Sequence, residues 1–126
     1  MDEVVYRRCR YVVDENQRLL DACAALEKGD YVTFGQKMNG SHEGLSRQYE
    51  VSCDELDFLA DIGHRTDGVL GARMMGGGFG GCTINLVRAE AYDGYLAEAT
   101  DRFAHRFGHA PRVIEVNISQ GARRIG

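Results

Sequence analysis

The run Gly76-Gly77-Gly78-Phe79-Gly80-Gly81 is the feature that most constrains what this chain can fold into. Glycine adopts positive φ angles without a Cβ penalty, and it lets another backbone or a ligand approach closely. Successive backbone N–H groups in such a run can converge into an anion-binding concavity. The run therefore predicts either a loop pressed against phosphate or sugar or a tight turn between two strands, and composition alone leaves both open.

The residues after the run exclude two familiar nucleotide-binding motifs. Gly76, Gly78 and Gly81 match G-x-G-x-x-G, but that dinucleotide motif requires a helix directly after the loop. Here the apolar residues Cys82, Ile84 and Leu86 alternate with their neighbours, which predicts a strand over 82–87. A Walker A loop is also excluded, because no Gly-Lys-Ser/Thr comes after the run.

Alternation predicts two further strands. Before the run, Leu70, Ala72 and Met74 alternate with their neighbours over 70–75. Near the end of the chain, Ile114, Val116 and Ile118 alternate in the same way and predict a last strand.

Helical spacing dominates the first half of the chain. Gly29 is expected to end the first helix, and Asp30 is placed to cap the second. Gly40 and Gly44 lower the helix propensity of that second helix. The first helix carries the apolar stripe of an amphipathic helix, which includes Cys9, Val12, Val13, Leu19, Leu20, Cys23 and Leu26.

Two more helices are predicted. Ser52 and Glu55 form an S-x-x-E capping box at the start of the third, where Asp54 and Asp57 add negative charge that the helix dipole favours. A fourth helix over 92–107, closed by Gly108, places Tyr92 and Tyr95 on its apolar face, where core packing is expected. The element order predicts an α+β fold, with a small, mostly antiparallel sheet covered by helices.

Length and charge limit the classes of protein that remain. The 126 residues suffice for one core and show no linker or repeat, so residues 1–126 are expected to form a single domain. The formal net charge of −4 argues against nucleic acid or an anionic membrane as the main partner. No apolar run is long enough to span a bilayer, and the charged N-terminus does not resemble a signal peptide.

Cysteine and histidine spacing points to no metal site. The four cysteines, Cys9, Cys23, Cys53 and Cys82, include no C-x-x-C pair, which favours a reduced, cytoplasmic chain. His105 and His109 have the i, i+4 spacing of a metal clamp, but Gly108 lies between them and no third ligand is evident. His42 shares a helix face with apolar residues and is expected to be a hydrogen-bonded core histidine.

Several stretches resemble the galactokinase family, which belongs to the GHMP kinases. Residues 71–83, GARMMGGGFGGCT, resemble the family's third conserved motif, G-S-R-M-T-G-G-G-F-G-G-C. Residues 15–18 resemble its E-N-x-R element, and residues 38–42 and 49–52 resemble its M-N-x-S-H and Y-E-V-S stretches. The resemblance covers nearly the whole chain from about Arg7.

The resemblance implies a fold and an activity. Galactokinases transfer the γ-phosphoryl group of ATP to the 1-hydroxyl of galactose, with Mg²⁺, in the cytoplasm. They have two domains with the active site in the cleft between them, and the C-terminal one is ferredoxin-like. By this resemblance the chain is a GHMP kinase C-terminal domain, its partner is the N-terminal domain of the same enzyme, and Gly76, Gly77, Gly78, Phe79, Gly80 and Gly81 line the ATP and sugar cleft.

The departures from the family pattern matter as much. The G-E-H-T-D-Y-like sugar motif and the P-x-G-x-G-L-S-S-S-A phosphate loop are not in this sequence, and none of its aspartates matches the family's catalytic one. No catalytic residue is therefore expected here, and the isolated chain is expected to be inactive and to bind no cofactor tightly. Ala72 and Met75 stand where the family usually has serine and threonine.

Two alternatives stay open at this point. One is a stand-alone anion-binding, sugar-binding or regulatory module, and the other is a related GHMP kinase with another small-molecule substrate. The galactokinase interpretation makes its own prediction, since a domain separated from its partner leaves an exposed apolar surface where the N-terminal domain would dock.

Overall fold

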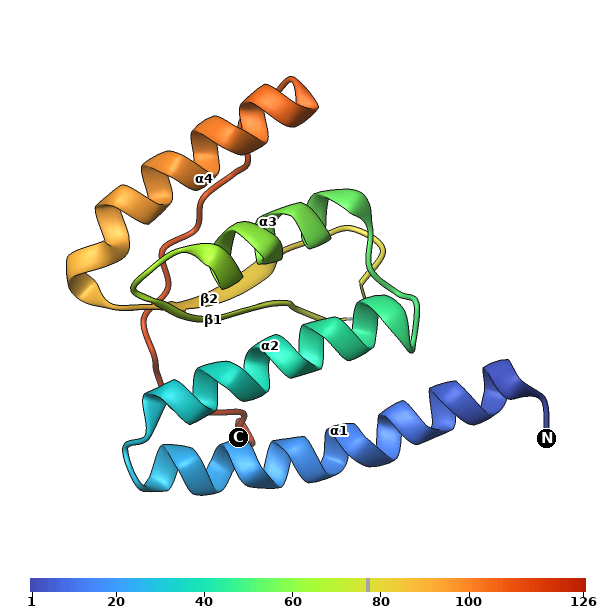
Figure 1. Cartoon of the computed structure of the whole chain (residues 1–126). Helices are drawn as coiled ribbons and strands as arrows, with labels where there is room; N and C mark the ends of the chain where they lie inside the picture. Colours follow the sequence, from blue (N-terminus) through green and yellow to red (C-terminus); the bar gives the residue numbers. More distant parts are fainter. Residues whose placement is uncertain (77) are drawn as a thin grey trace.

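The computed structural model describes residues 1–76 and 78–126 (Figure 1). In chain order its elements are α1 (Glu3–Glu27), α2 (Tyr31–Arg47), α3 (Asp54–Arg65), β1 (Val69–Met74), β2 (Thr83–Val87), the 3-10 helix η1 (Ala89–Ala91) and α4 (Tyr92–Phe107). The predicted α+β class, with a small antiparallel sheet covered by helices, is confirmed.

The connection between α1 and α2 has the helix end and the helix cap that the sequence predicts. The last residue of α1 is Glu27, and Gly29 lies two residues later in the left-handed region with φ of 69°. Asp30 caps α2, since its carboxylate accepts a hydrogen bond from the backbone N–H of Thr33 at 3.1 Å. The predicted helix end at Gly29 and the predicted cap at Asp30 are both confirmed.

The start of α3 differs from the prediction. The N-cap residue is Cys53, and no side chain caps the helix. The Ser52 hydroxyl lies one residue further out and donates a hydrogen bond to Oδ1 of Asp57 at 2.7 Å. The predicted capping box between Ser52 and Glu55 is therefore wrong, because Cys53 is the N-cap and the Ser52 hydroxyl donates to a carboxylate of the first turn.

Glycines allow α2 to pack closely against its neighbours. A Cβ at Gly35 would lie 2.0 Å from the carbonyl oxygen of Leu70, and a Cβ at Gly44 would lie 2.3 Å from the ring of Tyr11. These glycines lie inside one uninterrupted helix, so their low helix propensity is offset by contacts that no larger residue could make.

The sheet is a two-stranded antiparallel ladder. Its register runs from the pair Val69 and Val87 to the pair Met74 and Thr83, with an irregularity between Val69 and Gly71. The strands predicted over 70–75 and 82–87 are thus confirmed within one residue at each end.

The predicted last strand is wrong in this structure. A strand is held by hydrogen bonds to a neighbouring strand, and in the part of the chain that the structure describes no such bonds join residues 109–126 to the sheet. Ile114, Val116 and Ile118 are exposed instead. The segment leaves the end of α4 and runs back past the sheet to the C-terminus (Figure 1).

The core lies where α3 meets β1 and α4. α1 contacts α2, both α2 and α3 contact β1, and α4 packs on α3 (Figure 1). Tyr95 is buried, as its position on the apolar face of the fourth helix predicted. The buried side chains around α3 are Leu56, Ala60, Ile62, Ala72, Met74, Tyr95, Ala99 and Phe103.

The apolar stripe of α1 points away from this core. Val13 and Leu20 are 67% and 63% exposed. The buried residues of α1 are Tyr11 and Ala25. Polar groups also join α1 to α2: the Tyr11 hydroxyl donates to the backbone oxygen of Ser41 at 3.4 Å, and the Glu15 carboxylate accepts from the Ser41 hydroxyl. We call the exposed stripe the outer face of α1; it comprises Val5, Cys9, Val12, Val13, Leu19, Leu20, Cys23 and Leu26.

Candidate functional site

The glycine run forms the connection between the two strands. The loop of residues 75–82, which we call the glycine loop, is closed by a hydrogen bond from the N–H of Met75 to the carbonyl oxygen of Cys82 at 2.9 Å. Gly76, Gly78, Gly80 and Gly81 have φ between 77° and 117°, a region that side chains rarely adopt. Gly77, which the sequence also predicts in the site, lies outside the described residues.

Two sides of the glycine loop have different surroundings. On one side the loop is pressed against the connection between α2 and α3: a Cβ at Gly78 would lie 1.9 Å from the carbonyl oxygen of Val51, and the N–H of Phe79 donates to the same oxygen at 2.7 Å. At Gly80 and Gly81 a Cβ would meet no atom of residues 1–76 or 78–126 within 4 Å. The loop is thus anchored at Gly78 and open at Gly80 and Gly81.

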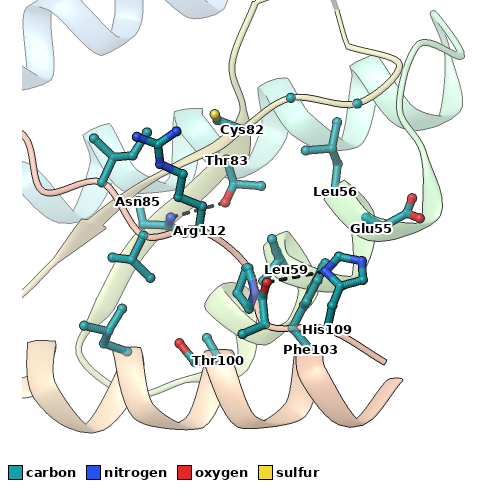
Figure 2. Close-up of a pocket in the computed structure, with 18 of the residues that line it drawn as sticks. Glu55, Leu56, Leu59, Cys82, Thr83, Asn85, Thr100, Phe103, His109 and Arg112 are labelled. Carbon is teal, nitrogen blue, oxygen red and sulfur yellow. Dashed lines mark hydrogen bonds between the residues drawn. The ribbon is translucent and has the colours of Figure 1, made fainter. Parts of the chain in front are cut away.

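The open part of the loop borders a cavity of roughly 910 Å³ (Figure 2). Its walls come from α3, β2, α4 and the segment after α4, and three residues of the predicted site, Phe79, Gly80 and Gly81, contribute to its lining. Gly76 and Gly78 are not among its lining residues. The labelled side chains around it are Glu55, Leu56, Leu59, Cys82, Thr83, Asn85, Thr100, Phe103, His109 and Arg112.

The polar groups of the cavity form a short chain of hydrogen bonds. The Tyr95 hydroxyl donates to Oδ1 of Asn85 at 2.9 Å, and the Asn85 amide donates to the Thr83 hydroxyl at 3.4 Å. Burial raises the pKa of the Tyr95 phenol to about 12, so this group stays a neutral hydrogen-bond donor at neutral pH. These groups can orient a polar ligand by hydrogen bonding.

A second group of polar residues lies behind the anchored side of the glycine loop. His42 on α2 is 4% exposed, and its Nδ1 accepts a hydrogen bond from the N–H of Met74 at 3.0 Å. Its Nε2 lies 2.9 Å from Oδ1 of Asp57, a carboxylate that also accepts from the hydroxyls of Ser46 and Ser52. His42 is therefore a hydrogen-bonded core histidine, as the sequence predicts.

Sequence reasoning missed the role of Asp57. Its position in the first turn of α3 suggested only a favourable contact with the helix dipole. His42 and Asp57 lie 15 residues apart on different helices, and no spacing rule pairs them. Only the S-x-x-E pattern around Ser52 drew attention to this turn, and it indicated a different partner for the serine.

Metal binding finds no ready site in this part of the protein. Among the residues that the structure describes, no group of three or more His, Cys, Asp or Glu side chains could hold a metal ion. All four cysteines are free thiols. Within residues 1–76 and 78–126, no helix has the length and apolar composition needed to cross a membrane.

The family model "GHMP kinases C terminal" matches residues 22–105. The chain therefore belongs to the GHMP kinase C-terminal family, whose small α+β architecture is the one described above.

Two known galactokinases are similar to this chain over nearly its whole length. The chain is 41% identical over 125 residues to a galactokinase of Clostridium beijerinckii, covering 99% of this chain and 32% of that protein. A galactokinase of Streptococcus thermophilus is 44% identical over 122 residues, covering 97% of this chain and 31% of that protein. The galactokinase resemblance found in the motifs thus extends over at least 97% of the chain, which spans about a third of the length of these relatives.

A solved structure agrees with both comparisons. The crystal structure of Lactococcus lactis galactokinase complexed with galactose superposes with a TM-score of 0.83 and 38% sequence identity. The superposition covers 86% of this chain and 28% of that one.

Proposed function

We propose that this chain is the C-terminal part of a galactokinase, an enzyme that transfers the γ-phosphoryl group of ATP to the 1-hydroxyl of galactose in the cytoplasm. The observation that carries the proposal is the 41% identity to a galactokinase over 99% of the chain, which includes the whole glycine loop. In this proposal residues 1–126 form one GHMP kinase C-terminal domain, and the N-terminal catalytic, ATP-binding domain lies outside them.

The glycine loop is the part of this chain that we assign to the cleft. We propose that Gly76 to Gly81 line the ATP and galactose sites, with the open side at Gly80 and Gly81 toward the ligands. A backbone without Cβ atoms lets a phosphate or a sugar hydroxyl approach the loop N–H groups closely. The anchored side at Gly78 holds those groups in place.

The remaining chemistry belongs to the N-terminal domain in this proposal. Bound Mg²⁺ would neutralise charge that develops on the transferred phosphoryl group. The described residues offer no cluster of carboxylates for it, so we assign Mg²⁺ to ATP and to the other domain. We accordingly assign no catalytic residue to this chain, and we expect the isolated chain to be inactive.

The outer face of α1 is where we propose that the N-terminal domain docks. Helices of a single domain usually turn their apolar side inward, but α1 buries only Tyr11 and Ala25 and exposes its apolar stripe. A contiguous exposed apolar surface of this kind marks an interaction site. About two thirds of the length of the relatives lies outside this chain, and that polypeptide is the occupant we assign to the face.

The proposed activity is tested by ATP-dependent phosphorylation of galactose. The assay compares the chain alone with the chain co-expressed with the N-terminal two thirds of the Clostridium beijerinckii galactokinase. We expect activity only in the pair. Activity of the chain alone would show that the catalytic parts were wrongly assigned to the other domain, and an associated but inactive pair would refute the galactokinase proposal.

A further inference from the structure

The glycine loop and the end of the strand that leads into it are each hydrogen-bonded to residues that precede them in the sequence. At the end of β1, the N–H of Met74 donates to Nδ1 of His42 at 3.0 Å. Within the loop, the N–H of Phe79 donates to the carbonyl oxygen of Val51 at 2.7 Å. Both acceptors come from α2 and the connection after it, so the position of the loop depends on how that segment is held.

Asp57 holds this segment in place. Its Oδ2 accepts from the hydroxyl of Ser46 at 2.9 Å, and its Oδ1 accepts from the hydroxyl of Ser52 at 2.7 Å. Oδ1 also lies 2.9 Å from Nε2 of His42. The carboxylate of Asp57 therefore contacts Ser46 near the end of α2, Ser52 in the following connection, and the imidazole of His42. That imidazole in turn accepts the hydrogen bond from Met74. Hydrogen bonds to a charged acceptor are stronger than neutral ones.

The directions of these bonds assign the histidine tautomer. A backbone N–H can only donate, so Nδ1 of His42 must be the unprotonated acceptor of the Met74 bond. The proton of the neutral ring then lies on Nε2 and is donated to Asp57. If the proton moved to Nδ1, two donors would face each other at Met74, and this fastening point of the loop would be lost.

We propose that His42 and Asp57 are positioning residues for phosphoryl transfer, acting on the glycine loop through the backbone of Met74 and Val51 without touching a substrate. The loop's place in the active site rests on the proposed galactokinase function, whereas the fastening of the loop does not. Misplacement of a ligand-facing backbone by about 1 Å is enough to lower a reaction rate roughly a hundredfold.

Two substitutions of His42 separate its two bonds. In His42→Asn the amide oxygen takes the place of Nδ1 and can still accept from Met74, while contact with Asp57 is lost. In His42→Gln the amide nitrogen takes the place of Nε2 and can still donate to Asp57, while the acceptor for Met74 is lost. Both variants remove the ring, so a difference between them reports which of the two bonds matters more and not the loss of packing.

The direct test is amide hydrogen exchange at Met74 and Phe79, measured by NMR on the 126-residue chain. We expect exchange at Met74 to be at least about tenfold faster in His42→Gln than in His42→Asn. Equal exchange in the two variants would overturn the proposal. If neither variant folds, the nitrogen NMR spectrum of the unchanged chain decides, since a proton on Nδ1 of His42 contradicts the assigned tautomer and a proton on Nε2 supports it.

Activity of the co-expressed pair gives a second readout. We expect His42→Gln to lower kcat/KM at least about tenfold more than His42→Asn does. A kcat/KM in both variants within about twofold of that of the unchanged pair would overturn the positioning role. If the pair with the unchanged chain is inactive, the galactokinase proposal fails, and the exchange experiment still decides whether His42 holds the loop.

Discussion

Helices α1 and α3 are both amphipathic, but they use their apolar sides in opposite ways. On α3 the apolar side packs inward, and Leu56, Ala60 and Ile62 are at most 2% exposed. On α1 the corresponding residues Val13 and Leu20 are 67% and 63% exposed. The stripe on α3 thus explains how this chain folds, and we attribute the stripe on α1 to assembly with a further polypeptide.

The difference extends to how each helix meets α2. The contacts between α1 and α2 include an aromatic ring and a polar pair, since Tyr11 packs against Gly44 and Glu15 bonds to Ser41. α3 contacts α2 through the carboxylate of Asp57, which is hydrogen-bonded to His42. An amphipathic pattern therefore predicts that the apolar face of a helix will be buried. Whether this chain or another polypeptide buries that face depends on how the helix packs in the fold.

Truncating one leucine on each helix should give the largest contrast. Leu56→Ala removes a fully buried side chain of α3, and we expect it to lower the free energy of unfolding by about 2–5 kcal/mol. Leu20→Ala removes an exposed side chain of α1 and should change that free energy by no more than about 0.5 kcal/mol in the isolated chain. Urea unfolding followed by circular dichroism measures both. Equal losses would mean that the outer face of α1 is buried within this chain.

A smaller effect, of pH on stability, should come from His42, which contacts α3 through Asp57. Burial lowers the pKa of His42 below its ordinary value of 6.5, against the opposing effect of Asp57. The unfolded chain therefore binds this proton more readily than the folded chain. The stability contributed by neutral His42 is complete above pH 6.5 and is lost as the pH falls toward the lower folded pKa.

Comparison with His42→Asn isolates this contribution from the other groups that titrate. The charged or titratable groups near His42 are Asp57 and His64 on α3 and Glu43 on α2. We expect the variant to be less stable than the unchanged chain at about pH 7.5 and the difference to shrink at about pH 5.5. A difference that grows on acidification would contradict a neutral, buried His42.

Most helices and strands could be predicted from the sequence, but the strand predicted near the end of the chain could not. Gly29, Asp30 and the alternation on both sides of the glycine run act locally, so their structural consequences could be predicted. Ile114, Val116 and Ile118 alternate equally well, but a strand also needs a free neighbour at the right distance. That condition depends on tertiary packing, which alternation does not contain.

Within the candidate site, the glycine loop could be predicted from the sequence, whereas the hydrogen bonds that hold it in place could not. The density of glycines marks residues 76–81 directly, because positive φ and close approach demand glycine. The bonds that join His42, Asp57 and Met74 link three elements, and the pattern at Ser52 favoured a helix cap instead. The Ser52 hydroxyl bonds to the carboxylate of Asp57, and that pairing depends on where α2 ends.

The proposed docking surface is tested most directly by asking whether the outer face of α1 binds the N-terminal part of a galactokinase. Titration calorimetry of the chain with the N-terminal two thirds of the Clostridium beijerinckii galactokinase should show a 1:1 complex. Leu20→Asp should weaken it at least about tenfold, because a charge replaces an apolar contact, while Ala97→Asp on the exposed side of α4 should leave the affinity unchanged. Equal binding by both variants, or a face that joins only a second copy of this chain, would contradict the account.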